Sequence, residues 1–180
     1  KLLSLGVLQQ RMIAGEPKPG VMHAVIFLGF MTLLVRKVQL LAIGFSPTFV
    51  YPGLAGGLYA ALKDVVEIAV TVAVLYAFWR RFVLRPRRLE PNREAIVVLS
   101  LILTIMITDF LYDGFKFALF AGSDTGIAHE QSFAFAGSAV AAALSGLSPE
   151  GLAAGQHAFY WIQMLTVFGF LVLLPWGEYF

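Results

Sequence analysis

The feature that most constrains the fold is a series of apolar segments long enough to cross a lipid bilayer. The first covers residues 20–45, a run of 26 residues in which the strongly polar side chains are limited to His23, Arg36, Lys37 and Gln39. A helix rises about 1.5 Å per residue, so this run is long enough to cross a hydrocarbon core of about 30 Å. Similar segments cover residues 58–79, 95–117 and 158–175. The pattern predicts a bundle of transmembrane helices.

The amino-acid composition supports the same fold class. Of the 180 residues, 59% are hydrophobic and 13% are charged, and the mean hydropathy is +0.80. A soluble domain of this length could not bury so much apolar surface. The chain has no cysteine, so it can hold neither a disulfide nor a cysteine-ligated iron–sulfur cluster. We therefore expect an all-α, polytopic membrane protein with four core spans, or five if residues 132–147 also cross.

Two segments are expected to lie on the membrane surface. Residues 1–19 carry apolar side chains at helical spacing opposite polar ones, which predicts an amphipathic interfacial helix; a cleaved signal peptide is the alternative. Residues 132–147 are rich in Ala, Gly and Ser and are short for a crossing, which favours a helix on the outer surface. Residues 46–57 and 121–131 are expected to be loops. Residues 20–180 then form the membrane domain.

A cluster of arginines predicts the orientation in the membrane. Residues 80–94 contain six arginines and lie between two predicted spans. By the positive-inside rule this loop is cytoplasmic. Nucleic-acid binding is the rival interpretation of such a cluster, but the position between two spans favours a role in topology. We therefore expect the lipid bilayer, and no nucleic acid, as a partner.

Ionisable side chains within or beside the spans are candidate functional residues, because charge is costly in lipid. His23 lies just inside the first span, near the predicted cytoplasmic face, where a neutral imidazole could ligate haem iron. The other interpretation of His23 is simple hydrogen bonding. His157, at the outer start of the last span, has the same two interpretations, and hydrogen bonding is favoured there. His129 lies in a predicted loop and is assigned no role.

Three stretches of the sequence resemble a known family. They are VLQQRMIAGEPKPGVMHAVIFLGF, RRFVLRPRRL and HAFYWIQMLTVFGFLVLLPWGEYF. Together they look like the membrane domain of the respiratory nitrate reductase gamma-subunit superfamily. The closer similarity is to the heterodisulfide-reductase-like branch, which includes electron-transfer-flavoprotein:menaquinone oxidoreductases.

The resemblance implies an electron conduit in the inner membrane of a prokaryote. In that superfamily, histidines from the helix bundle hold b-type haem, and electrons pass to or from a quinone. The implied partners are a cytoplasmic iron–sulfur domain or subunit and an electron-transfer flavoprotein. His23 matches the first ligand of the proximal haem, and LLPWGEYF matches the run that leads to the second, which would follow Phe180. We therefore expect the polypeptide to continue into an iron–sulfur domain.

The ligands of a second, distal haem are missing. The corresponding positions hold Leu33 and Gln163. The resemblance therefore implies one haem b at most, near the cytoplasmic face. His157 lies six residues before Gln163 and is an alternative ligand, at a depth that differs by about 9 Å.

Eight polar residues are expected at a similar depth in the outer third of the bundle. They are Arg36, Lys37, Lys63, Asp64, Glu67, Asp109, Asp113 and Gln163. One interpretation is a buried ion-pair network that joins the spans. The other is a quinone pocket, in which Lys63 or Arg36 donates a hydrogen bond to the quinone and the carboxylates carry protons. The two can coexist, and a quinone pocket nearer His23 is a further alternative.

The sequence thus predicts the membrane anchor and electron conduit of a respiratory oxidoreductase. Electrons would pass between the iron–sulfur partner, a haem b bound by His23 and the quinone pool. The alternative is a cofactor-free structural anchor, or a small transporter, with a buried ion-pair network.

Overall fold

The computed structural model describes residues 17–84, 93–120 and 122–176, and every regular element in this part of the chain is helical. In chain order the elements are α2 (Pro17–Phe45), α3 (Gly53–Trp79), the π-helical turn η2 (Arg80–Leu84), α4 (Arg93–Phe120), α5 (Thr125–Phe133), α6 (Phe135–Ala143) and α7 (Pro149–Trp176). The expectation of an all-α fold is confirmed. Most of the predicted interfacial helix 1–19 lies outside the described residues.

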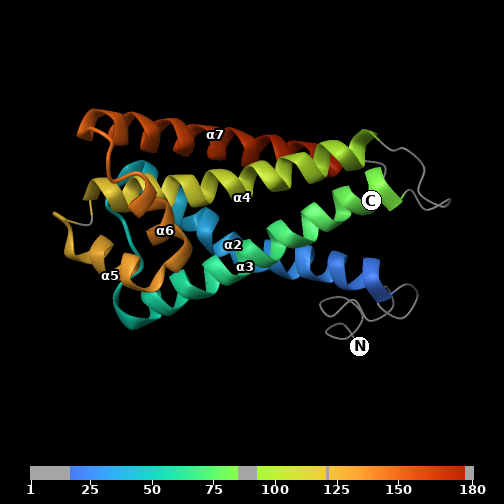
Figure 1. The fold of residues 1–180 in the computed structure, drawn as a ribbon, viewed down its shortest axis with the longest axis horizontal. Coiled ribbons are helices and arrows are strands. Elements are labelled where there is room, and N and C mark those ends of the chain that lie inside the picture. Colours follow the sequence, from blue (N-terminus) through green and yellow to red (C-terminus); the bar gives the residue numbers. More distant parts are fainter. Residues whose placement is uncertain (1–16, 85–92, 121, 177–180) are drawn as a thin grey trace.

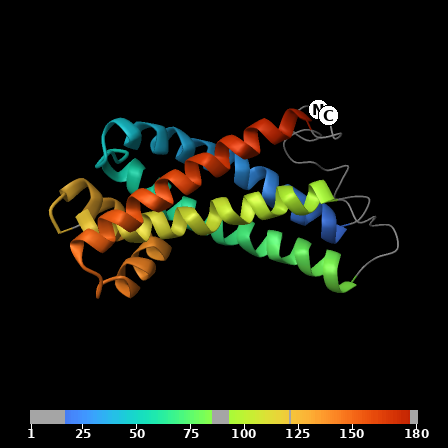
Figure 2. The ribbon, with the colours of Figure 1, turned by 90° about the horizontal axis from the view of Figure 1, so that it is seen from above.

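Four long helices run along the longest axis of the molecule, and the two short ones lie together at one end (Figure 1). We call the latter the α5–α6 end. At the opposite end, the η2 end, α2 and α4 begin while α3 and α7 finish (Figure 2). Neighbours in the chain are therefore antiparallel. Among the four long helices, the most extensive packing is between α4 and α7 and between α2 and α3.

Three of the long helices are long and apolar enough to cross a membrane: Gly20–Phe45, Arg93–Phe120 and Pro149–Leu173. The fourth, α3, has 27 residues, but every stretch of 18 within it contains Lys63, Asp64 and Glu67. All three of these side chains are buried. The exposed face of α3 carries large apolar residues, namely Leu58, Leu62, Val65, Val72 and Leu75. The charges of α3 thus point into the bundle and not toward its surroundings.

The start of α3 differs from the sequence prediction. Residues 46–57 were expected to form a loop, but the helix begins at Gly53. Gly53 has a φ of 64°, which glycine adopts without strain. A Cβ at Gly56 would overlap the backbone of Tyr51, and one at Gly57 would overlap the ring of Phe133. Gly56 and Gly57 let the first turns of α3 pack closely against Tyr51 and Phe133. The glycine-rich composition of this segment thus reflects close packing of a helix and not a loop.

The segment between α4 and α7 also differs from the prediction. Residues 121–131 were expected to be a loop, but α5 begins at Thr125. Asp124 caps α5, because its Oδ1 accepts hydrogen bonds from the backbone N–H groups of Gly126 at 2.8 Å and Ile127 at 3.0 Å. The next helix, α6, has nine residues and rises about 14 Å, too little for a crossing. The final helix α7 begins at Pro149, nine residues before the predicted start.

An apolar layer built from all four long helices lies between the middle of the bundle and the η2 end. Its buried residues are Leu33, Val70, Val74, Ile105, Met106 and Phe170. Leu33, which the family resemblance aligned with a haem ligand, is therefore part of the hydrophobic core. On the other side of this layer the interior becomes strongly polar.

Candidate functional site: a buried charge network

Charged side chains converge at one level of the bundle. Arg36 lies 19 residues from the start of α2, Asp109 lies 16 from the start of α4, and Lys63 lies 16 from the end of α3. At about 1.5 Å per residue, each is roughly 24–29 Å from the η2 end of its helix. Eight charged residues in this region are at most 6% exposed: Arg36, Lys63, Asp64, Glu67, Asp109, Asp113, Lys116 and Glu130. We call these residues, together with Lys37, the charge network.

Arg36 joins α2 to α4. Its Nε donates to Asp109 Oδ1 at 2.9 Å, and one terminal nitrogen donates to Asp113 Oδ1. The other terminal nitrogen donates to Gln39 Oε1 at 2.7 Å. The guanidinium also lies 5.7 Å from the centre of the Tyr112 ring. A planar group with donors in several directions suits this position better than the single ammonium of lysine.

Lys63 joins α3 to α4. Its Nζ lies 2.8 Å from Asp64 Oδ1, 3.3 Å from Glu67 Oε2 and 2.7 Å from Asp113 Oδ2. Asp113 is therefore shared between the cations of α2 and α3. The second oxygen of Asp64 accepts the backbone N–H of Ala136 at 2.7 Å, at the first turn of α6. A carboxylate is favoured at a helix N-terminus, so the network also holds α6 in place.

The network extends to α5 through residues that the sequence analysis did not select. Glu130 accepts a hydrogen bond from Gln39 Nε2 at 2.9 Å and pairs through its other oxygen with Lys116. Lys116 follows Asp109 and Asp113 at helical spacing, which is a signal that it shares their face. Glu130 gave no such signal, because its segment was taken for a loop.

Two of the predicted site residues are placed differently from the rest. Lys37 lies at the edge of the network, with its Nζ 3.4 Å from Asp109 Oδ2 and its side chain 17% exposed. Gln163 is fully buried on α7, and neither its amide nitrogen nor its amide oxygen has a hydrogen-bond partner among the described residues. All eight polar residues named from the sequence thus lie in or beside one interior region.

The three histidines lie in different parts of the bundle. His23 is exposed on α2 near the η2 end, whereas His157 is exposed in the first half of α7, toward the other end. His157 Nδ1 lies 2.9 Å from Ala153 O of its own helix. His129 Nε2 lies 3.3 Å from Gly53 O at the start of α3. Within the described part of the chain, no two histidines are placed to bind one iron atom.

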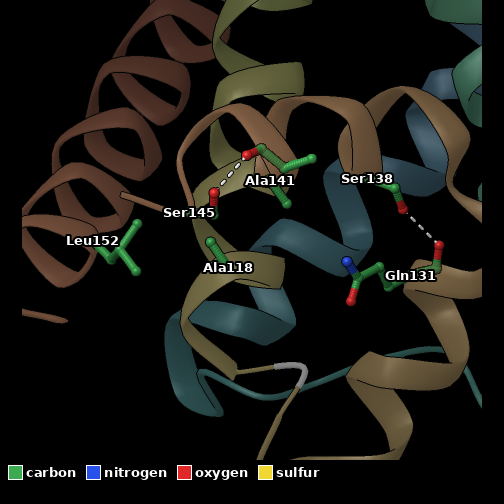
Figure 3. Close-up of a pocket in the computed structure, with 7 residues that line it drawn as sticks. Ala118, Gln131, Ser138, Ala141, Ser145 and Leu152 are labelled. Carbon is green, nitrogen blue, oxygen red and sulfur yellow. Dashed lines mark hydrogen bonds between the residues drawn. The ribbon is translucent and has the colours of Figure 1, made fainter. Parts of the chain in front are cut away.

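Two hollows flank the bundle. One, of about 320 Å³, lies at the α5–α6 end and is lined by Ala118, Gln131, Ser138, Ala141, Ala142, Ser145 and Leu152 (Figure 3). Its two serine hydroxyls already donate to backbone carbonyls, of Gln131 and Ala142, at 2.8 Å each. The other hollow, of about 230 Å³, lies at the η2 end and is lined by Met22, Ala77, Arg80, Arg81, Ala95, Val98 and Leu99. We call it the η2 hollow; one of its lining residues, Met22, precedes His23 in the sequence.

The chain is similar to parts of two larger oxidoreductases. It is 26% identical over 97% of its length to the probable iron–sulfur-binding oxidoreductase FadF of Bacillus subtilis. It is 24% identical over 94% of its length to the EtfAB:quinone oxidoreductase of Syntrophomonas wolfei. In each case it spans 24% of the relative's length. No family model and no solved structure matches the chain. The similarity supports a relationship to oxidoreductases and a role in electron transfer.

Proposed function

We propose that this chain is the membrane domain of a quinone-linked oxidoreductase and passes electrons between a cytoplasmic iron–sulfur partner, a b-type haem and the quinone pool. The observation that carries the proposal is the alignment of nearly the whole chain with one quarter of two oxidoreductases. One is named as iron–sulfur-binding and the other as acting on quinone. A segment made of membrane-length helices is suited to anchor such an enzyme and to reach a lipid-soluble substrate.

In this proposal α2, α3, α4 and α7 cross the membrane. The fourth span, α3, is acceptable in lipid because its three charges are buried and its exposed face is apolar. The η2 end, which begins with Arg80 and Arg81, faces the cytoplasm. The α5–α6 end then faces outward, in the inner membrane of a prokaryote.

His23 is the candidate axial ligand of the haem. Its imidazole is exposed at the η2 end, where it is accessible to a cofactor at the surface of the bundle. His129 and His157 lie toward the other end, so the second axial ligand would come from outside the described residues. When bound, the haem would supply the one-electron redox chemistry, and the protein would orient it and exclude water.

The quinone headgroup fits the η2 hollow better than the charge network. The nitrogens of Arg36 and Lys63 are already engaged by Gln39 and four carboxylates, so a bond to quinone would break buried ion pairs. The η2 hollow is lined mainly by apolar side chains, as small-molecule pockets usually are. It also lies on the same side of the apolar layer as His23. A short separation favours fast electron transfer between haem and quinone.

The test is a reduced-minus-oxidised absorption spectrum of the purified full-length protein. We expect a b-type haem band in the wild type, its loss in His23→Ala, and no change in the control His157→Ala. His157 is exposed and bonds within its own helix, so its removal leaves the cytoplasmic side intact. A band that survives His23→Ala contradicts the assignment of the ligand.

A cofactor-free anchor or small transporter is the second candidate. It is favoured by the closure of the charge network, in which the ion pairs join α2, α3 and α4 without an added ligand. The same spectrum separates the two candidates. No haem band in the wild-type full-length protein would leave the structural anchor as the better description.

A further inference from the structure

The charge network contains one more acidic side chain than basic side chains. Its cations are Arg36, Lys37, Lys63 and Lys116, and its carboxyl groups are Asp64, Glu67, Asp109, Asp113 and Glu130. An uncompensated charge in a buried, apolar environment is expensive, and proteins usually neutralise it by a proton. One of the five carboxyl groups is therefore expected to be protonated.

Four of the five carboxyl groups are well stabilised as anions. Both oxygens of each lie close to a donor: Asp64 to Lys63 and the Ala136 N–H, Asp109 to Arg36 and Lys37, Asp113 to Arg36 and Lys63, and Glu130 to Gln39 and Lys116. The contact of Asp113 Oδ2 with Lys63 Nζ is an ion pair at 2.7 Å that does not have hydrogen-bond geometry. Protonating any of them would lose an ion pair or a hydrogen bond that a carboxylate makes.

Glu67 is the exception. Its Oε2 lies 3.3 Å from Lys63 Nζ, which is the most distant of the three carboxylates around that ammonium. Its Oε1 is buried and receives no hydrogen bond from any described donor. Glu67 is thus the carboxyl group for which the anionic form gains least from its surroundings.

A protonated Glu67 would have a hydrogen-bond acceptor in Asp109, its acidic neighbour on α4. Glu67 and Asp109 belong to the same buried cluster, because Lys63 contacts both Glu67 and Asp113, and Arg36 contacts both Asp113 and Asp109. Neighbouring carboxylates repel, whereas a neutral Glu67 can donate its O–H to the ionised Asp109. Asp109 is held as an anion by Arg36 and Lys37, so the proton belongs on Glu67.

Gln163 adds free hydrogen-bonding capacity beside this pair. The helices α4 and α7 are antiparallel (Figure 2), and two ring contacts fix their alignment. Phe115 of α4 packs against Phe159 of α7, and Tyr112 of α4 packs against Tyr160 of α7. One turn further along, Gln163 lies level with Asp109. Among the described residues its amide N–H₂ and C=O have no hydrogen-bond partner, so both are available to a water molecule.

We propose that Glu67 is a neutral carboxylic acid that donates to Asp109, and that it is the group through which the charge network takes up and releases a proton. The charged groups around Glu67 are Lys63 and Asp64 from α3 and Asp109 and Asp113 from α4, with Arg36 and Lys37 from α2 paired to these carboxylates of α4. Glu130 of α5 is linked to Arg36 through Gln39. Any use of this proton in quinone chemistry rests on the proposed function. The protonation itself does not.

Infrared spectroscopy of the full-length protein in lipid nanodiscs tests the proposal without any redox turnover. A protonated carboxylic acid has a C=O stretching band that is separate from carboxylate bands and shifts in D₂O. We expect the wild type to show this band for a buried group and Glu67→Gln to lose it. The control Asp64→Asn changes an ionised carboxylate on the same helix and should retain the band.

Thermal unfolding provides the second measurement. Glutamine has nearly the shape of a neutral glutamic acid and carries no charge, so Glu67→Gln should keep the wild-type melting temperature. Asp113→Asn removes an anion shared by Arg36 and Lys63 and should lower it clearly. A buried carboxylic acid band that persists in Glu67→Gln would overturn the proposal. So would destabilisation or misfolding of Glu67→Gln as severe as that of Asp113→Asn. Absence of a haem band from the wild-type protein, which would contradict the proposed function, would leave both results unaffected.

Discussion

Arg36 shows at the level of one residue how charge is accommodated in an apolar bundle. It is fully buried, yet its three nitrogens each have a partner, on α2 itself or on α4. Such an arrangement contributes less to stability than its number of ion pairs suggests, because desolvation opposes the attraction. Removing one member of the network is strongly destabilising, because the remaining charges stay buried without compensation.

Replacing Arg36 by methionine should therefore strongly destabilise the protein. The change leaves Asp109 and Asp113 with weaker compensation, and we expect a loss of about 3–5 kcal/mol in the free energy of unfolding. Denaturant unfolding of the purified protein in detergent measures it. The control is Lys37→Met, which removes a partly exposed cation 3.4 Å from Asp109. Its cost should be about 1 kcal/mol or less. Equal costs for the two variants would contradict the central position of Arg36.

At the level of the elements, small residues set how closely the helices approach. Gly155 of α7 lies against the ring of Phe115 of α4, and Gly137 of α6 lies against Phe117. Gly29 of α2 lies against Val70 of α3 in the same way. In the proposed membrane location, lipid offers no hydrophobic drive for helices to associate, so close packing at such positions would matter for the bundle.

Gly155→Ala should loosen the α4–α7 contact. A Cβ at this position would overlap three carbons of the Phe115 ring, which is itself buried, and overpacking of this kind costs about 1–3 kcal/mol. Gly169→Ala on the same helix is the matched control, because nothing lies within 4 Å of the added Cβ. It should be neutral or stabilising by about 1 kcal/mol through helix propensity. Thermal unfolding of both variants in the same detergent measures the two effects on stability. An unchanged melting temperature for Gly155→Ala would show that α4 and α7 do not pack this closely.

At the scale of the whole molecule, the polar and apolar parts of the interior are stacked along the bundle. The charge network occupies the region toward the α5–α6 end, and the apolar layer around Leu33 separates it from the η2 end. The exposed His23 and the η2 hollow lie beyond that layer. The proposed electron-transfer site and the proposed proton site are therefore in different parts of the bundle.

Cysteine labelling tests this arrangement in the membrane, because the chain has no native cysteine. Single cysteines at Thr48, Ser148 and Leu84 are all at exposed positions. With four crossings, an impermeant maleimide should label the Thr48→Cys and Ser148→Cys variants from outside intact cells. The Leu84→Cys variant should react only after permeabilisation. If residues 132–147 formed a fifth crossing, positions 48 and 148 would be labelled from opposite sides.

The sequence alone predicted the all-α class, the long apolar helices and most members of the polar region. Hydropathy is a local property, so the runs around residues 20–45 and 95–117 predicted α2 and α4 within a few residues. The costly charges within the spans likewise marked Arg36, Lys63 and Asp109 as residues that had to meet. The sequence did not predict the helical start of α3, because glycines such as Gly56 occur both in loops and where a helix packs closely against its neighbours.

Only the tertiary structure decided how the charges are paired. Glu130 joins the network because α5 folds back over the bundle, and nothing in its local sequence indicated a buried position. Two features depend on how the helices are rotated and aligned: the sharing of Asp113 between Arg36 and Lys63, and the position of Glu67 Oε1, which has no donor among the described residues. Composition and spacing give the depth of a side chain along its helix. The partner that it meets at that depth is fixed by the packing of the helices against one another.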